Sequence, residues 1–175
     1  MPNDNEARNE EFYDALAEHF HLIFDDWDAS MRRQGLIIAR LLPPSERGAI
    51  LDAACGIGTQ SLPLSALGYS VEGSDVSVAA IARAKRECAA RGLRCEFRVD
   101  DMRTLTTAPT SRYAAVIAMD NALPHLESDD DLVTALSAMR SRLLPRGKVI
   151  ISVRDYESFL KAVRKGRLEA LAEEK

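Results

Sequence analysis

The sequence predicts an α/β domain in which a mostly parallel sheet carries helices on both faces. Three observations lead to this prediction. Short apolar segments, each the length of a buried strand, alternate along the chain with helical segments. A glycine-containing turn, LDAACGIGTQS at residues 51–61, joins the first strand to a helix. Each apolar segment then ends on polar side chains, which a parallel sheet would gather at one edge.

The expected elements divide the chain into three parts: an N-terminal helical lid (1–45), a core that binds a ligand (46–156) and a charged helical tail (157–175). In the lid, apolar residues at helical spacing predict a helix over residues 10–24, and Ser30 is the expected N-cap of a second helix that ends at the prolines 43 and 44. In the core, strands are expected at 49–53, 69–73, 94–99, 113–119 and 148–153, helices at 60–67, 78–91 and 129–143, and a turn at 145–147.

Composition limits the classes of function. At 175 residues, with 46% hydrophobic and 29% charged residues, the chain suits one α/β domain with a sizeable core. A net charge of −4 gives no reason to expect a nucleic-acid partner, and no apolar run is long enough to span a bilayer. The acidic N-terminus is unlike a signal peptide, and three unpatterned cysteines favour a reducing cytoplasm and predict no metal site.

The glycine turn and the strand ends predict a cofactor site. Gly56 and Gly58 allow the backbone to approach a ligand closely, although the pattern lacks the third glycine of the dinucleotide fingerprint. Asp75, about 20 residues after the turn, is placed to accept both hydroxyls of a ribose. This spacing suits a nicotinamide cofactor as well as S-adenosylmethionine. A carboxylate at Asp101 for the adenine amine, with Met102 as an apolar wall, favours the second.

On these motifs the chain resembles the class I S-adenosylmethionine-dependent methyltransferases, and more narrowly the glycine and sarcosine N-methyltransferases. The narrower likeness rests mainly on Tyr13, Arg32, Asn121 and Arg154 with Tyr156. The resemblance covers about residues 12–156 and implies a Rossmann-like fold. It is carried by FYDALAEHFHLIFDDWDAS, LDAACGIGTQ, EGSDVS, DDM, MDNALPHL and SVRDY.

The resemblance also implies roles for single residues. Asn121 would orient the amine of an amino-acid acceptor, Arg154 would grip its carboxylate, and both are expected to be catalytic together with Tyr13. Arg32 would meet the methionine carboxylate from the lid. His125 could be a base, but a packing role in its loop is the favoured interpretation. The implied cofactor-binding residues are Tyr13, Trp27, Arg32, Ala53, Gly56, Gly58, Asp75, Val76, Asp101, Met102 and Met119.

The C-terminus departs from the family. Class I methyltransferases continue after the fifth strand with a helix and an antiparallel hairpin, whereas YESFLKAVRKGRLEALAEEK carries no strand pattern. The hairpin is therefore expected to be missing, and a natural short form, a truncated protein and an engineered one all fit. The fifth strand would then be an open edge, which predicts either that the tail covers it or that two chains share it in a homodimer.

The sequence thus predicts an S-adenosylmethionine-dependent N-methyltransferase that acts on a small amino acid of the glycine or sarcosine type, with S-adenosylhomocysteine as product. Because of the shortened C-terminus, the alternative is a module that binds the cofactor or its product with little or no turnover. A nicotinamide-dependent oxidoreductase fits less well, since the third glycine is absent and Asp101 and Met102 suit adenine.

Overall fold

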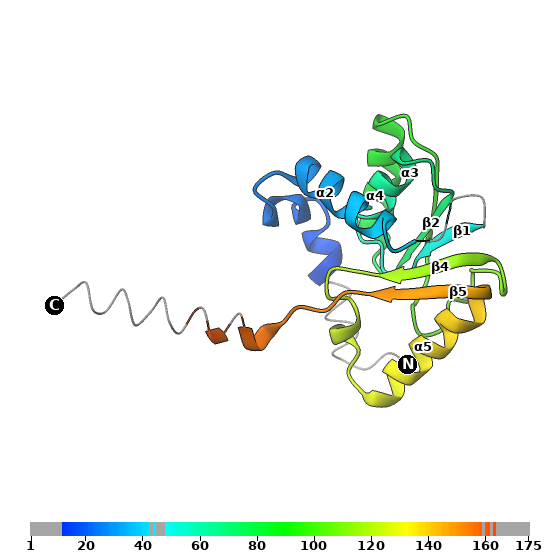
Figure 1. Ribbon diagram of the computed structural model, residues 1–175. Coiled ribbons are helices and arrows are strands. Elements are labelled where there is room, and N and C mark those ends of the chain that lie inside the picture. The colour runs from blue at the N-terminus through cyan, green and yellow to red at the C-terminus, as the bar shows by residue number, and fades with distance from the viewer. Residues whose placement is uncertain (1–11, 43, 45–47, 159, 162, 164–175) are drawn as a thin grey trace.

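The protein is described by a computed structural model that covers residues 12–42, 44, 48–158, 160, 161 and 163. One sheet of parallel strands in the order β3-β2-β1-β4-β5 forms its centre (Figure 1). The order reverses between β1 and β4, which is where an open α/β sheet binds its ligand. The predicted fold class is confirmed. The strands are β1 (Ala49–Asp52), β2 (Val71–Asp75), β3 (Cys95–Val99), β4 (Tyr113–Ala118) and β5 (Leu143–Ile151).

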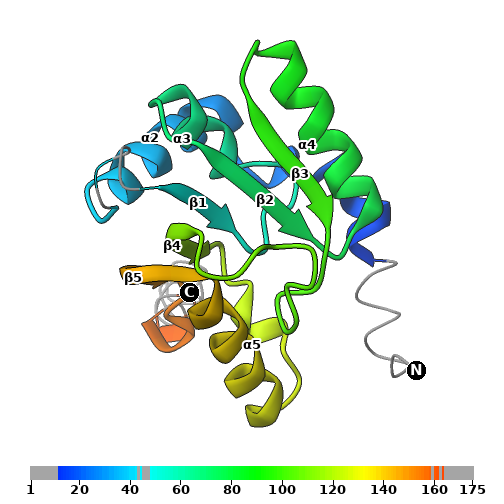
Figure 2. The same ribbon diagram turned by 90° about the vertical axis from the view of Figure 1, so that its right-hand side faces the viewer.

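Helices cover both faces of the sheet (Figure 2). On one face lie α2 (Trp27–Ala39), α3 (Ser61–Ala66) and α4 (Val78–Ala90), and on the other lies α5 (Asp129–Arg142). Successive strand residues point to opposite faces. Ile50 accordingly belongs to a buried cluster with Ile38 and Leu64, whereas its neighbour Leu51 belongs to a cluster with Met139 of α5. Both faces of β1 are therefore buried, as its apolar residues 49–51 predict.

Asp26 caps α2, so the expected cap at Ser30 is wrong. The Asp26 carboxylate accepts the backbone N–H of Ala29 at 2.8 Å, and the helix begins one residue later at Trp27. Ser30 lies inside the helix, where its hydroxyl accepts hydrogen bonds from Arg33 and Gln34. Asp26, four residues before Ser30, is a favoured N-cap type, and a helix that begins there starts with the buried Trp27.

The N-terminal segment docks on α4. Residues 12–16 are helical and a short 3₁₀ helix, η1 (Phe20–Ile23), follows a turn, so the helix expected over 10–24 is broken; residues 10 and 11 lie outside the described part. The Asp14 carboxylate accepts hydrogen bonds from the Ser77 hydroxyl and, at 3.1 Å, from the backbone N–H of Ala79. Arg83 of α4 donates to the Ala17 carbonyl at 2.7 Å. These contacts place Tyr13 above the sheet edge.

β5 is longer than expected and takes in the predicted turn at 145–147. The register against β4 shifts between Tyr113 and Ala115, and Arg146 takes a left-handed φ of 64°. The extra residues of β5 are thus absorbed as an irregularity within the strand rather than as a loop before it. After β5 the described residues run away from the sheet (Figure 1). In the described part of the chain, no helix is long and apolar enough to cross a membrane.

Candidate functional site

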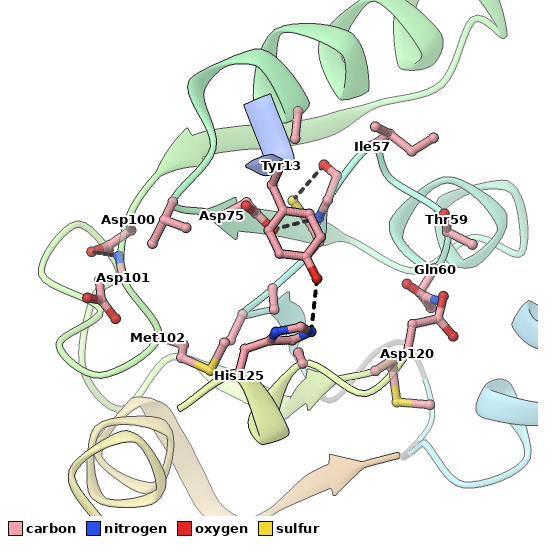
Figure 3. A pocket seen from close by; sticks show the side chains of 18 of the residues that line it. Tyr13, Ile57, Thr59, Gln60, Asp75, Asp100, Asp101, Met102, Asp120 and His125 are labelled. Atoms are coloured by element: carbon pink, nitrogen blue, oxygen red, sulfur yellow. Dashed lines mark hydrogen bonds between the residues drawn. The ribbon is translucent and has the colours of Figure 1, made fainter. Parts of the chain in front are cut away.

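A cavity of about 360 Å³ lies over the carboxyl ends of the strands, where the sequence placed the site. This volume falls within the range of about 300–1,000 Å³ that is typical of small-molecule sites. Figure 3 shows its long axis: Asp100 and Asp101 lie at one end, Thr59 and Gln60 at the other, and Asp75 with Tyr13 between them. The cavity can therefore hold an elongated ligand across the switch point of the sheet.

The glycine loop and Asp75 form the middle of the cavity wall. Gly56 has a left-handed φ of 50°, and a Cβ built there would have no heavy atom within 4 Å, so the bare backbone borders open space. The two carboxylate oxygens of Asp75 accept the N–H groups of Gly56 at 2.8 Å and Ser77 at 3.0 Å. Burial raises the pKa of this carboxyl, although both hydrogen bonds oppose the shift. Each oxygen keeps a second lone pair, so the fixed carboxylate can still accept ligand hydroxyls.

The end of β3 holds two carboxylates in different ways. Asp100 accepts backbone N–H groups of Thr106 and Thr107 and the Thr107 hydroxyl; burial would raise its pKa, but these hydrogen bonds outweigh burial and lower it. Asp101 binds Arg103, whose Nη2 lies 2.6 Å from Oδ2. Asp100 thereby fixes the loop, and Asp101 faces the cavity already paired with a guanidinium, beside Met102.

Tyr13 reaches across the cavity from the N-terminal segment. Its hydroxyl and Nε2 of His125 are joined by a hydrogen bond of 2.9 Å, and the two rings meet edge to face at 5.4 Å (Figure 3). Burial, and then the carboxylate of Asp75, raise the pKa of Tyr13, so the phenol stays protonated at neutral pH. His125, for which the sequence favoured a packing role, thus lines the cavity and holds the tyrosine in place.

Trp27 and Arg32, which the sequence expected in the lid, do not line this cavity. Trp27 is 8% exposed and belongs to the core, and the guanidinium groups of Arg83 and Arg91 lie 5.4 and 5.2 Å from its ring centroid. Its indole N–H donates to the Thr59 hydroxyl at 3.1 Å, so it supports the cavity wall from behind. Arg32 is exposed on α2.

The end of β4 combines two residues in the left-handed region. Asp120 and Asn121 have φ values of 51° and 69°, and Asp120 lines the cavity. Both polar groups of the Asn121 side chain are engaged: Nδ2 donates to the Tyr156 hydroxyl at 2.8 Å, and Oδ1 accepts the backbone N–H of Arg154 at 3.0 Å. Asn121 thereby ties the end of β4 to the segment after β5, and the exposed Arg154 lies beside the cavity rather than in its wall.

Asp52 lies beneath the site at the end of β1. It is fully buried and accepts the Ser61 hydroxyl at 2.7 Å. Burial raises its pKa to about 7; the Ser61 hydrogen bond opposes that shift, and the carboxylates of Asp75 and Asp120 add to it. A buried carboxyl with a pKa near neutrality thus sits between the two halves of the cavity.

The structure brings most of the expected cofactor residues to one cavity. Gly58 lies outside the wall with a φ of 94°, and a Cβ there would meet Leu62 at 3.0 Å. Residues that the sequence did not assign, Thr59, Gln60 and Asp120, also form the wall; only the polar end of β4 could have indicated Asp120. The expected residues that line the cavity are Tyr13, Ala53, Gly56, Asp75, Val76, Asp101, Met102 and Met119.

These residues fit an adenosyl sulfonium compound. The cavity offers an uncovered glycine backbone, a central carboxylate fixed by two N–H groups, and further carboxylates at both ends. A cation with ribose hydroxyls and an amino group complements such a wall. Burial raises the pKa of the Cys55 thiol in the same loop, which keeps it protonated and makes it a poor nucleophile.

Comparisons with known proteins agree with this geometry. The family described as "Methyltransferase domain" matches residues 50–147. The chain is 29% identical over 157 residues to the glycine/sarcosine N-methyltransferase of Halorhodospira halochloris, and the matched region makes up 90% of this chain and 58% of that protein. It is 31% identical over 145 residues to the enzyme of the same name from Parasynechococcus marenigrum, and the matched region makes up 81% of this chain and 51% of that protein.

The fold is shared with solved structures as well. The PH0226 protein from Pyrococcus horikoshii OT3 superposes with a TM-score of 0.68 at 24% identity, over 87% of this chain and 69% of that chain. The chain spans a little more than half the length of the curated relatives named above. With the family match over more than half of the chain, the protein belongs to the class I S-adenosylmethionine-dependent methyltransferases.

Proposed function

We propose that this protein transfers a methyl group from S-adenosylmethionine to the amine of a small amino acid of the glycine or sarcosine type. One observation carries the proposal: a single elongated cavity joins the adenosyl-type wall at Asp75 and Asp101 to a second, acidic end at Asp120, with Tyr13 across it. Several relatives bear the name glycine/sarcosine N-methyltransferase, which supports this acceptor class.

Different residues along the cavity would bind different parts of the cofactor. Asp101 and Met102 would hold the adenine and Asp75 the ribose, so that the amino-acid half reaches the end formed by Thr59 and Gln60. The cofactor supplies an activated methyl group, and positioning and exclusion of water are what remain for the protein. Tyr13, fixed by His125, covers the middle of the cavity, where it would limit access of water to the reacting atoms.

Methyl transfer and binding are measured separately to test the proposal. We expect calorimetry to show binding of S-adenosylhomocysteine, and mass spectrometry to show methylated product with glycine or sarcosine as acceptor. Binding without transfer to either acceptor would contradict the proposal and favour a binding module. No binding of S-adenosylhomocysteine would contradict the assignment of the cavity itself.

Arg154 is the proposed partner of the acceptor carboxylate. It follows β5 at the sheet edge, its side chain is exposed, and Asn121 fixes its backbone beside Asp120. Arg154→Lys keeps the charge but loses the planar two-pronged donor, so we expect KM for glycine to rise about tenfold with S-adenosylhomocysteine affinity unchanged. Arg94→Lys, at another exposed arginine, is the matched control. Wild-type KM in Arg154→Lys would show that the carboxylate is held elsewhere.

A further inference from the structure

Asp120 is held in a backbone conformation that a non-glycine residue rarely adopts. Its φ is 51°, the next residue has a φ of 69°, and its N–H donates to the Ser152 hydroxyl at 2.9 Å. Aspartate and asparagine are among the few non-glycine residues that adopt this conformation, and unusual backbone conformations of this kind are concentrated at functional sites. The Asp120 side chain lies in the cavity wall and is exposed, so this backbone conformation presents a carboxylate to a ligand.

A chain of hydrogen bonds from α2 orients this carboxylate. Gln60 is only 2% exposed, and its Nε2 donates to Oδ2 of Asp120 at 2.7 Å and to Oε1 of Gln34 at 2.8 Å. Both amide hydrogens are thereby used, so a flipped amide would set its oxygen against two other oxygens. Figure 3 shows Gln60 and Asp120 side by side at the end of the cavity opposite Asp101.

The other aspartates of the cavity wall are already occupied by protein donors. Asp75 accepts two backbone N–H groups, Asp100 accepts groups of Thr106 and Thr107, and Asp101 binds Arg103. Among the described residues, the carboxylate of Asp120 accepts only the Gln60 bond, which leaves Oδ1 for a ligand. Asn121, expected to receive the acceptor amine, instead uses its amide on Tyr156 and Arg154.

We propose that Asp120 binds the amine of the methyl acceptor and that Gln60 is the residue that positions it; this inference rests on the proposed N-methyl transfer. A carboxylate pairs with the ammonium form and, after one proton has left, accepts an N–H that directs the nitrogen lone pair. In the transfer that lone pair forms the new C–N bond, the C–S electron pair stays on sulfur, and the methylated nitrogen is left as an ammonium; the one proton released overall is the one that went to solvent before the transfer. Arg154 lies on the neighbouring strand end, as a zwitterionic acceptor requires.

Asp120→Asn tests the anchor, because asparagine tolerates a left-handed φ and keeps an oxygen for Gln60 while removing the charge. The protein saturated with S-adenosylhomocysteine is titrated by NMR with glycine, sarcosine and propylamine, of which the last has no carboxylate. We expect the wild type to bind all three and Asp120→Asn to bind each about tenfold more weakly or worse, with unchanged S-adenosylhomocysteine affinity. Asp130→Asn, an exposed acid in the first turn of α5, is the charge-matched control.

The outcomes separate the two proposals. If Asp120→Asn binds the three amines within about twofold of the wild type, Asp120 is not the anchor and the proposed function stands. If the wild type binds propylamine but neither amino acid, and Asp120→Asn loses propylamine, the anchor stands and the amino-acid acceptor is wrong. If the wild type binds no amine while it binds S-adenosylhomocysteine, both proposals are wrong.

Gln34→Leu tests the positioning role of Gln60 from outside the cavity wall. It removes the acceptor that fixes the Gln60 amide, so we expect propylamine affinity to fall severalfold while S-adenosylhomocysteine affinity stays unchanged. Gln34→Glu keeps an acceptor for the same N–H and should restore the wild-type value. Equal amine affinity in Gln34→Leu and the wild type would overturn the positioning role.

Discussion

The two halves of the sheet end in different ways. At β2 and β3, backbone N–H groups hold the cavity-facing carboxylates: Asp75 is fixed by Gly56 and Ser77, and Asp100 by the loop that follows it. At β4 and β5, the strand ends are fixed by side chains that are distant in sequence, and Asp120 and Arg154 stay exposed. The first half is preorganised locally, whereas the second depends on long-range contacts.

This difference matches two kinds of ligand. An adenosyl group can be bound by a loop and a strand end of fixed geometry, so local motifs are enough to form its site. In the proposed site, the acceptor would depend on groups from α2, β4 and the segment after β5, which fold into place only with the whole sheet. We therefore expect changes in the first half to alter cofactor affinity and changes in the second half to leave it nearly unchanged.

Asp75→Ala should produce the largest effect. The change removes the proposed acceptor for two ribose hydroxyls and the partner of Gly56 and Ser77, and each charge-assisted hydrogen bond contributes about 1.5–3 kcal/mol. We expect S-adenosylhomocysteine affinity, measured by calorimetry, to fall about a hundredfold or more. Asp75→Asn, which keeps one acceptor oxygen, should lose less. Unchanged affinity in Asp75→Ala would mean that the ribose is held elsewhere.

Asp52, at the end of the strand between the two halves, should make stability depend on pH. Burial raises its pKa from the usual 3.8 to about 7, with Asp75 and Asp120 adding to the shift. The folded protein therefore keeps a proton that the unfolded chain has lost, so the stability from this group is full below about pH 4 and is lost as pH rises through about 7. The loss amounts to a few kcal/mol.

Urea unfolding at pH 5 and pH 8 measures this dependence. We expect wild-type stability to fall between the two values and Asp52→Asn to fall much less, because its amide does not titrate. Asp120→Asn removes one of the negative charges that raise the pKa of Asp52, so that pKa should fall and the loss of stability should move to lower pH. Equal pH dependence in the wild type and Asp52→Asn would contradict the assignment.

The first half of the site could be predicted from the sequence because its contacts are local. The glycine turn, Asp75 and the Asp101–Met102 pair each follow directly from a strand whose apolar run is visible in the chain. The parallel sheet and the place of the cavity at the carboxyl ends of its strands follow from the regular alternation of strands and helices. Their roles in binding remain predictions until a ligand is measured.

The second half was harder to predict because it depends on contacts between distant segments. Gln60 meets Gln34 and Asp120, which lie far from it in the chain, and no periodicity marks such a triad. Trp27 was expected to bind the cofactor, yet its indole is buried and contacts Thr59 and two arginines. Whether the tail covers β5 or two chains share that edge also remains a prediction, and most of the tail lies outside the described residues.

Asn121→Ala should give the smallest effect and tests the independence of the two halves. The change removes the tie between β4 and the segment after β5 and places alanine at a φ of 69°, so we expect the free energy of unfolding to fall by about 1–2 kcal/mol. Asn121→Gly removes the tie without the backbone strain and should lose less. S-adenosylhomocysteine affinity, measured by calorimetry, should stay within about twofold of the wild type in both variants. A loss of affinity as large as that of Asp75→Ala would show that the ends of β4 and β5 also shape the cofactor half, and that the two halves are not independent.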